Sequence, residues 1–189
     1  MRSASRFYIN LSMKSIVVAL IHLFPLGVHI QAQQYPYPPD ERGYIVRVGE
    51  AVPEFELNCT DGSVYSRQSL LGTAYVLQFT ASWCGVCRKE MPHLEREVWQ
   101  RYRGEHFLLL GVDLDETPEK VRAFAKQMGI TYPIAPDPGG DLFYKIAAPK
   151  SGVTRNIVVD QTGEIVFLTR LFQEEEFEAM KSIIARLVD

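Results

Sequence analysis

The feature that most constrains the fold is a pair of cysteines placed between two segments of different periodicity. The segment "AYVLQFT" (74–80) is a nearly continuous apolar run, which is typical of a strand covered on both faces. After "WCGVC", apolar residues recur at steps of four, three, four and four, so an amphipathic helix is predicted with one inward face. The residues of that face are Cys87, Met91, Leu94, Val98 and Tyr102. A strand that enters a helix through a Cys-x-x-Cys turn places reactive sulfurs at the start of the helix.

The rest of the chain supplies the elements of one α/β domain. In "PEFELNC", the apolar residues Phe55, Leu57 and Cys59 alternate with polar ones, and the "DG" turn that follows predicts an N-terminal β-hairpin. A second buried strand, a helix that begins at Thr117-Pro118, a strand pair joined by "QTG" and a closing amphipathic helix come next. These segments are 106–115, 117–128, 156–160 with 164–169, and 173–188. The order predicts an α/β fold with a central mixed β-sheet flanked by helices.

The amino end has the composition of an export signal. Three basic residues precede the apolar stretch 16–26, which is too short to span a bilayer comfortably. We therefore expect residues 1–32 to be a signal peptide, or else an uncleaved anchor, and residues 33–47, rich in proline and tyrosine, to be an extended linker. The domain proper is predicted over 48–189, in the periplasm or, with an anchor, at the membrane.

Charge and composition exclude several functions. Without residues 1–32 the chain has 17 Lys and Arg against 23 Asp and Glu, a net charge of −6, which argues against nucleic-acid binding. Only two histidines remain there, so a histidine-rich metal centre is not expected. No metal and no organic cofactor are predicted.

A Cys-x-x-Cys pair can bind zinc, staple a fold or exchange disulfides. Structural zinc needs four ligands, and the chain offers no second pair of cysteines. A staple that closes so short a loop constrains the unfolded chain little. The predicted helix instead gives the two cysteines different environments. Cys84 is expected to be exposed at the N-terminus of this helix, where free N–H groups lower the pKa of a thiol, and Cys87 is expected to be shielded on the inward face. This asymmetry favours thiol–disulfide exchange.

The segment "FTASWCGVCRKEMP" resembles the active site of the thioredoxin superfamily, in particular its exported TlpA/ResA-type branch. The resemblance covers roughly residues 48–189, including "VGEAVPEFEL" and "VVDQTGEIV". It implies a thioredoxin-like fold, with Cys84 as the nucleophile, Cys87 as the resolving cysteine, and Pro92 bending the helix. The substrate-binding residues that it implies are Trp83, which shields the site, Gly85, Val86, Val153 and Thr154.

Glu90 matches an acidic position of that branch. It flanks the inward face three residues after Cys87, where burial would raise the pKa of its carboxyl and suit it to proton transfer. An ordinary surface glutamate near a helix start is the alternative. Gln78 stands where cytoplasmic thioredoxins have a buried acid, which strengthens the case for Glu90.

Two departures from the family pattern affect the site. Gly85-Val86 replaces the Gly-Pro of thioredoxins, and Thr154 stands where the superfamily normally has a cis-proline facing the cysteines. The neighbouring Arg155 is expected to be a solvated surface residue; the alternative is that it favours a thiolate. The Pro/Gly-rich segment 129–150 is interpreted as an insertion that, with the loop at Thr154, selects the substrate.

Two further residues receive structural interpretations. Cys59 shares a strand face with Phe55 and Leu57, so a buried, inert thiol is expected. His93 follows Pro92 and is expected to be solvated or to cap the helix.

The predicted function is an exported thiol–disulfide oxidoreductase that contributes to cell redox homeostasis. We expect a monomer that an upstream membrane or periplasmic thiol donor keeps reduced, and that reduces disulfides in exported proteins. Apocytochrome c is one substrate class that the resemblance implies. Two alternatives remain: a thiol peroxidase of peroxiredoxin-like type, and a non-enzymatic module that holds copper(I) or a partner on the dithiol.

Overall fold

The central element is a five-stranded mixed sheet. The computed structural model describes residues 42–104 and 106–189, and the sheet has the strand order β5-β4-β3-β6-β7. Strand β3 pairs in parallel with β4, and β4 with β5, whereas β6 is antiparallel to β3 and β7 is antiparallel to β6. The strands are β3 (Ala74–Thr80), β4 (Phe107–Leu114), β5 (Ile134–Asp137), β6 (Arg155–Val159) and β7 (Ile165–Leu168). The predicted α/β fold with a mixed sheet is confirmed.

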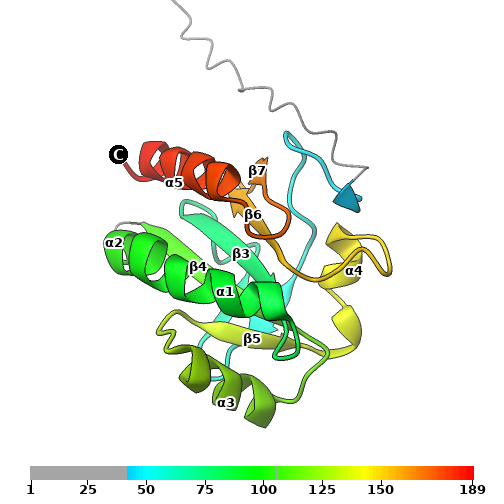
Figure 1. The fold of residues 1–189 in the computed structure, drawn as a ribbon. Coiled ribbons are helices and arrows are strands. Elements are labelled where there is room, and N and C mark those ends of the chain that lie inside the picture. The colour runs from blue at the N-terminus through cyan, green and yellow to red at the C-terminus, as the bar shows by residue number, and fades with distance from the viewer. Residues whose placement is uncertain (1–41, 105) are drawn as a thin grey trace, which may run out of the picture. The chain divides into compact units, whose positions relative to one another are not determined.

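One face of the sheet is covered by helices (Figure 1). Helix α1 (Gly85–His93) continues through a π-helical segment, η2 (Leu94–Trp99), into α2 (Gln100–Tyr102), and α5 (Glu174–Val188) covers the same face. Their apolar side chains form one core with Val76, Leu109 and Val158 of the sheet. Helix α3 (Pro118–Met128) packs with Met91 and Ile134, on the β5 side.

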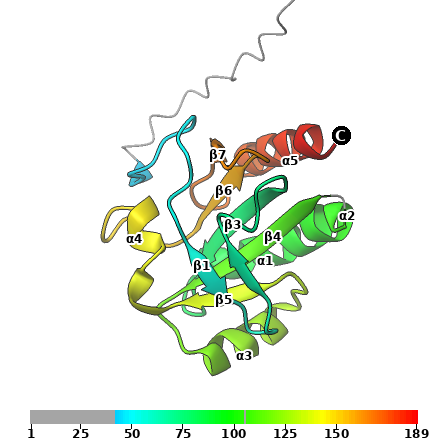
Figure 2. The ribbon, with the colours of Figure 1, turned by 180° about the vertical axis from the view of Figure 1, so that it is seen from behind.

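The other face is covered by irregular segments and short elements (Figure 2). The predicted N-terminal hairpin is present as β1 (Glu56–Asn58) and β2 (Val64–Ser66), which pair antiparallel and form their own two-stranded sheet. Helix α4 (Phe143–Ile146) completes this layer, and the core beneath includes Leu77, Phe79 and Leu110. Because alternate residues of a strand point to opposite faces, Val76 and Leu77 belong to different cores.

The packed part of the chain begins before residue 48. Tyr44 and Val46 are buried in the core, and Tyr44 forms an isolated β-bridge with Ala147. Residues 42–47, which the sequence assigns to a linker, therefore pack against α4 and the sheet. The predicted signal or anchor over 1–32 lies outside the described residues. Among the residues that the structure describes, no helix is long and apolar enough to cross a membrane.

The segment 129–150 is more than an insertion. It contains β5, a 3-10 turn η3 (Pro138–Gly140) and α4, none of which the sequence analysis predicted. Strand β5 forms an edge of the sheet, where Pro136 is tolerated because one side of the strand needs no partner. Gly111 of β4 has no side chain at the point where a Cβ atom would lie 2.8 Å from Ile134 Cγ1, so β5 can approach closely.

The helix ends follow local sequence rules. Thr117 accepts a hydrogen bond from Lys120 N–H and caps α3, which ends at Gly129 with a left-handed φ of 66°. Pro92 lies inside α1, and the wider π-helical turns begin two residues later at Leu94. Proline lacks the N–H that a regular helix needs, so a change of helical type at this place has a local cause.

Candidate active site

The two cysteines form a disulfide at the N-terminus of α1. Cys84 is the N-cap residue with an extended backbone, and its sulfur accepts a hydrogen bond from Cys87 N–H at 3.2 Å. The Cα atoms of the pair are 5.3 Å apart. A helix N-terminus presents unsatisfied N–H groups and a positive dipole end, so this position stabilises negative charge on the Cys84 sulfur.

The burial of the two cysteines differs from the prediction in one respect. Cys87 is 0% exposed, as predicted for the shielded partner, but Cys84 is only 7% exposed rather than open to solvent. The physical reason is the loop before β6, because Thr154 lies directly against the sulfurs. Its Oγ1 atom is 3.1 Å from Cys84 Sγ and 3.1 Å from Cys87 Sγ.

Thr154 therefore occupies the place that the sequence analysis assigned to it. Thr154 is 3% exposed. The peptide bond before Thr154 is trans, because none of the peptide bonds in 42–104 and 106–189 is cis. The Thr154 carbonyl accepts hydrogen bonds from Arg170 Nη1 and from Leu171 N–H, both at 3.2 Å. The backbone beside the hydroxyl is thus fixed by its neighbours.

Arg155 is a core residue, and the expectation of a solvated surface arginine is wrong. It is 0% exposed, and its guanidinium lies 4.5 Å from the centroid of the Tyr44 ring and 5.6 Å from that of Phe143. Its Nη2 donates to Ser151 Oγ at 2.7 Å and to the Gly152 carbonyl at 3.0 Å. Desolvation by this burial lowers the pKa of Arg155 below its usual value. The residue binds the loop that carries Thr154 to the N-terminal segment.

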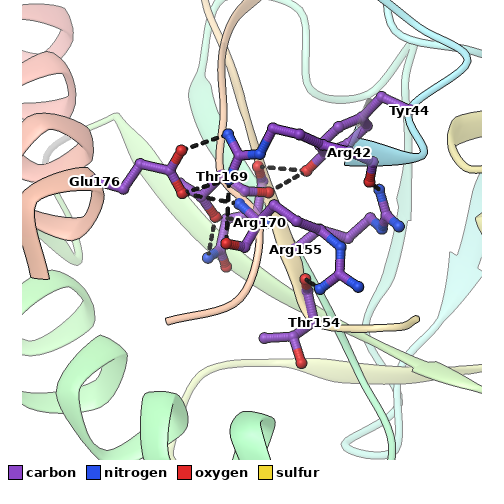
Figure 3. Close-up of polar contacts among 8 residues, drawn as sticks. Arg42, Tyr44, Thr154, Arg155, Thr169, Arg170 and Glu176 are labelled. Carbon is purple, nitrogen blue, oxygen red and sulfur yellow. Dashed lines mark hydrogen bonds and ion pairs between the residues drawn. The ribbon is translucent and has the colours of Figure 1, made fainter. Parts of the chain in front are cut away.

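A polar cluster extends from Arg155 to helix α5 (Figure 3). Glu176 Oε2 accepts hydrogen bonds from Arg42 Nη2 at 2.7 Å and from Arg170 N–H at 3.0 Å. Tyr44 donates its hydroxyl to the Thr169 carbonyl. We call Arg42, Tyr44, Arg155, Arg170 and Glu176 the arginine cluster. It connects residues 42–46, the Thr154 loop, the end of β7 and the start of α5.

Glu90 is a buried residue of α1, three positions after Cys87. It is 1% exposed, its Oε1 accepts a hydrogen bond from Asn156 Nδ2 at 2.7 Å, and its Oε2 has no hydrogen-bond partner among the described residues. Desolvation by burial raises the pKa of Glu90 to about 8, and the amides of Asn156 and Gln78 offset only part of this. The alternative of an ordinary surface glutamate is therefore wrong.

Two buried amide side chains, Asn156 and Gln78, lie next to the Glu90 carboxyl. Asn156 and Gln78 are paired across β6 and β3, and both are fully buried below the carboxyl. Beside the start of α5, the residues that enclose Glu90 leave no room for a water molecule; they are Thr169, Leu171, Phe172, Gln173, Glu176 and Phe177. The sequence analysis missed Asn156, which only its register opposite Gln78 connects to the site.

The turn that precedes Cys84 is held by a second carboxylate that the sequence analysis missed. Glu116 accepts hydrogen bonds from Ser82 N–H and Ser82 Oγ, both at 2.7 Å, and forms an ion pair with Lys120. Arg88 Nε donates to the Ser82 carbonyl at 2.9 Å. The chain therefore enters α1 in one fixed conformation.

The remaining predicted substrate-binding residues differ in their exposure to solvent. Trp83 is 64% exposed and Gly85 is exposed, whereas Val86 is half-buried. Val153 is buried in the core, so its side chain faces away from solvent. Trp83, Gly85 and Val86 thus offer accessible surface next to Cys84, and the roles of all four in binding stay predictions.

Cys59 and His93 are the two further residues that the sequence analysis singled out. Cys59 is a free, buried thiol, as predicted, and desolvation raises its pKa to about 11. His93 is partly exposed, its Nδ1 is 2.8 Å from Glu97 Oε1, and its ring lies against Phe172. These contacts are structural for both residues.

Comparison with known proteins agrees with this geometry. A model of the AhpC/TSA family matches residues 48–168, and a thiol-disulfide oxidoreductase ResA of Bacillus thuringiensis subsp. konkukian is 27% identical over 124 residues, covering 64% of this chain and 68% of the relative. A solution structure from Bacteroides thetaiotaomicron, provisionally named a protein disulfide isomerase, is 50% identical, with a TM-score of 0.75 over 77% of this chain and 92% of that one.

A crystal structure from Chlorobium tepidum, provisionally named a thiol:disulfide interchange protein DsbE, is 24% identical and shares the fold, with a TM-score of 0.66 over 76% of this chain and 99% of that one. The Cys84–Cys87 disulfide at the start of a helix fits the chemistry that the names of the ResA relatives state. The chain belongs to the AhpC/TSA family of thioredoxin-like proteins and is a thiol–disulfide oxidoreductase.

Proposed function

We propose that this enzyme works outside the cytoplasm and reduces disulfides in other exported proteins, with an upstream thiol donor returning it to the dithiol state. The observation that carries the exchange chemistry in this proposal is the asymmetry of the redox pair. Cys84 caps a helix and receives the Cys87 N–H, whereas Cys87 is fully buried three residues before Glu90, whose pKa burial raises to about 8. Such a pair has a distinct attacking sulfur and a distinct resolving sulfur.

The reaction that we propose has two exchange steps. The Cys84 thiolate attacks one sulfur of the client disulfide, the client S–S bond breaks, and the second client sulfur leaves as a thiolate. The Cys87 sulfur then attacks Cys84 in the mixed disulfide, and the first client sulfur leaves. Two electrons pass from the Cys84–Cys87 dithiol to the client, and the two protons of that dithiol balance the two client thiols.

Glu90 is the acid–base group that we assign to these protons. It lies three residues after Cys87 on the same helix, a spacing that places side chains next to each other. Its pKa of about 8 allows it to hold or release a proton at neutral pH.

An exported location is supported by the sequence of residues 1–32 rather than by the described residues. Basic residues followed by a short apolar stretch are typical of a signal peptide. The net charge of −6 for residues 33–189 is compatible with protein clients and unfavourable for nucleic acid. Apocytochrome c cysteines are one client class within this proposal, and we propose that the enzyme acts as a monomer.

The two alternative functions receive little support from the geometry of the site. A thiol peroxidase of peroxiredoxin-like type is expected to have a Pro-x-x-x-Thr/Ser-x-x-Cys segment, whereas here Thr80 stands four residues before Cys84 with no proline upstream in that strand. The Thr80 Oγ1 atom contacts Met91 Sδ at 3.4 Å. For copper(I), a third ligand would be expected, and within 42–104 and 106–189 no group of three His, Cys, Asp or Glu side chains is arranged to bind a metal ion. We therefore retain disulfide reduction as the proposal.

A redox titration of the chain without residues 1–32 tests the direction of electron flow. The state of Cys84 and Cys87 is read from the mass shift after alkylation in thiol buffers of stepped potential. A reductant is expected to have a potential below roughly −220 mV. A value above about −150 mV would mark an oxidant and overturn the proposed direction. A Cys59→Ala protein titrated in parallel is the matched control, because it retains only the redox pair.

A further inference from the structure

We propose that Thr154 is a catalytic residue, whose hydroxyl donates a hydrogen bond to whichever of the two active-site sulfurs carries the negative charge. The inference rests on the proposed exchange between Cys84 and Cys87. The Cys84 thiolate would receive this bond before it attacks the client, and the Cys87 thiolate would receive it during resolution. The residue that departs from the family pattern would then have a chemical role of its own.

The geometry places one hydroxyl between two sulfurs. Thr154 Oγ1 is 3.1 Å from each Sγ atom, which is within hydrogen-bond reach of both. The sulfurs of a disulfide have no hydrogen, so Thr154 must be the donor in the oxidised state. One hydroxyl has one proton, and a rotation about its C–O bond is enough to direct that proton to either sulfur. A proline in this position would have no donor group.

The two sulfurs depend on this donor to different degrees. Cys84 also receives the Cys87 N–H at 3.2 Å and lies at the helix N-terminus. For Cys87, which is 0% exposed, Thr154 is the only side-chain donor found within the described residues. Water cannot solvate a charge at such a position, and hydrogen bonds to charged groups are the stronger ones. The resolving step therefore needs Thr154 more than the attacking step does.

The arginine cluster keeps the hydroxyl in place (Figure 3). Arg170 Nη1 binds the Thr154 carbonyl at 3.2 Å, and Arg155 binds Ser151 and Gly152 earlier in the same loop. The loop cannot withdraw from the disulfide without breaking several of these bonds, so the hydroxyl stays close through both exchange steps.

Protons and electrons balance in the resolving step. In the mixed disulfide, Cys87 gives its proton to Glu90 in those molecules whose Glu90 carboxyl has already released its own proton to solvent, and the Thr154 O–H donates to the thiolate that results. Cys87 attacks the Cys84 sulfur, the bond between Cys84 and the client breaks, and the client sulfur leaves with the electron pair. Thr154 keeps its own proton throughout.

Stopped-flow reaction with dithiobis(nitrobenzoic acid), an aromatic disulfide, separates the two steps. Attack by Cys84 releases one coloured thiolate at a rate proportional to reagent concentration. Resolution by Cys87 releases the second at a rate independent of that concentration. The proteins to compare are the reduced wild type, Thr154→Val, which has the same shape without a hydroxyl, and Thr154→Ser, which keeps the hydroxyl.

We expect Thr154→Val to slow the second phase about tenfold at neutral pH, since a hydrogen bond to a charged group is worth at least one decade in rate. The first phase should slow less, and Thr154→Ser should keep most of the wild-type second phase. A Thr154→Val second phase within about twofold of wild type would overturn the proposal. Equal slowing in Thr154→Ser would also overturn it, because packing rather than the hydroxyl would then be responsible.

The same traces distinguish this inference from the proposed function. If wild-type protein releases only one thiolate, Cys87 does not resolve, and the proposed exchange mechanism itself fails. If wild type releases two and Thr154→Val resolves equally fast, the exchange mechanism stands and only the role of Thr154 is lost. Thermal unfolding of each variant, followed by circular dichroism, verifies that the compared proteins are folded.

Discussion

Replacing Glu90 by glutamine should make the protein more stable, and increasingly so as the pH rises. The substitution keeps the shape of the side chain and removes its ionisation. Glu90 is 1% exposed, and one of its carboxylate oxygens has no hydrogen-bond partner in the described part of the chain. An ionised carboxylate at this position is therefore costly, which is why burial raises its pKa to about 8.

The magnitude follows from proton linkage. The ordinary pKa of the carboxyl is 4.5, and the folded value is about 8, so between these values the folded state holds a proton that the unfolded state has lost. The free energy of unfolding of the wild type then falls by about 1.4 kcal/mol per pH unit, or roughly 3 kcal/mol from pH 4.5 to pH 7. Below about pH 4.5 both states are protonated, and above about pH 8 the loss is complete. The Glu90→Gln protein has no such dependence at this position, because an amide does not titrate in this range.

Urea unfolding of the oxidised proteins at several pH values between about 4.5 and 8 measures this difference. Burial also raises the pKa of Asp113 to about 8, but Asp113 is present in both proteins, so its contribution cancels in the comparison. We expect the stability advantage of Glu90→Gln to grow by roughly 3 kcal/mol from about pH 4.5 to about pH 7. A difference that stays constant over this range would refute the buried, protonated carboxyl on which the acid–base assignment depends.

Three further outcomes are expected from the same structure. Asn156→Ala should move the Glu90-dependent step in the pH profile of thiol alkylation upward, because the Asn156 amide favours the ionised carboxylate; no movement would contradict that contact. Arg155→Met should lower the free energy of unfolding by about 3 kcal/mol, because it leaves buried carbonyl groups of the Thr154 loop without a donor. A loss below about 0.5 kcal/mol in urea unfolding would argue against a core role for Arg155. Cys59→Ala should keep full thiol–disulfide exchange turnover, and native wild type should resist alkylation at Cys59 at about pH 8, because burial holds the pKa of this thiol at about 11.

Local patterns predicted the elements that have strong periodicity. The inward face from Cys87 to Tyr102 is buried as expected, and so is the alternation of Phe55, Leu57 and Cys59. Strand β5 was missed because Pro133 and Pro136 interrupt its short pattern, and pairing with β4 compensates for this only in the folded sheet. The signal for β5 was indirect: a glycine, Gly111, in the middle of a buried strand marks a close approach by a neighbour.

The site residues also divide into those that local spacing predicted and those that it did not. Cys84, Cys87 and Glu90 belong to one helix, so their spacing alone predicted that they would lie close together. Arg155 looked like a surface residue because arginine is rarely buried without partners, and its partners are Tyr44, more than a hundred positions earlier, and the carbonyls of its own loop. Cys84 was expected to be open because a helix N-terminus usually is, and the loop that covers it carries Thr154, 70 residues later in the chain.

The sequence by itself determined the chemistry of this protein: a Cys-x-x-Cys at the start of a helix, an acid one turn later, and an α/β order of elements. These features depend on contacts between near neighbours, which residue spacing encodes directly. The family resemblance placed Thr154 opposite the cysteines, but only the tertiary structure showed its hydroxyl within hydrogen-bond reach of both sulfurs. Only the tertiary structure also showed the Asn156 amide on Glu90 and the arginine cluster that joins residues 42–46 to the loop. Such contacts join segments far apart in the chain, and their geometry is set by strand register and core packing, which no local pattern specifies.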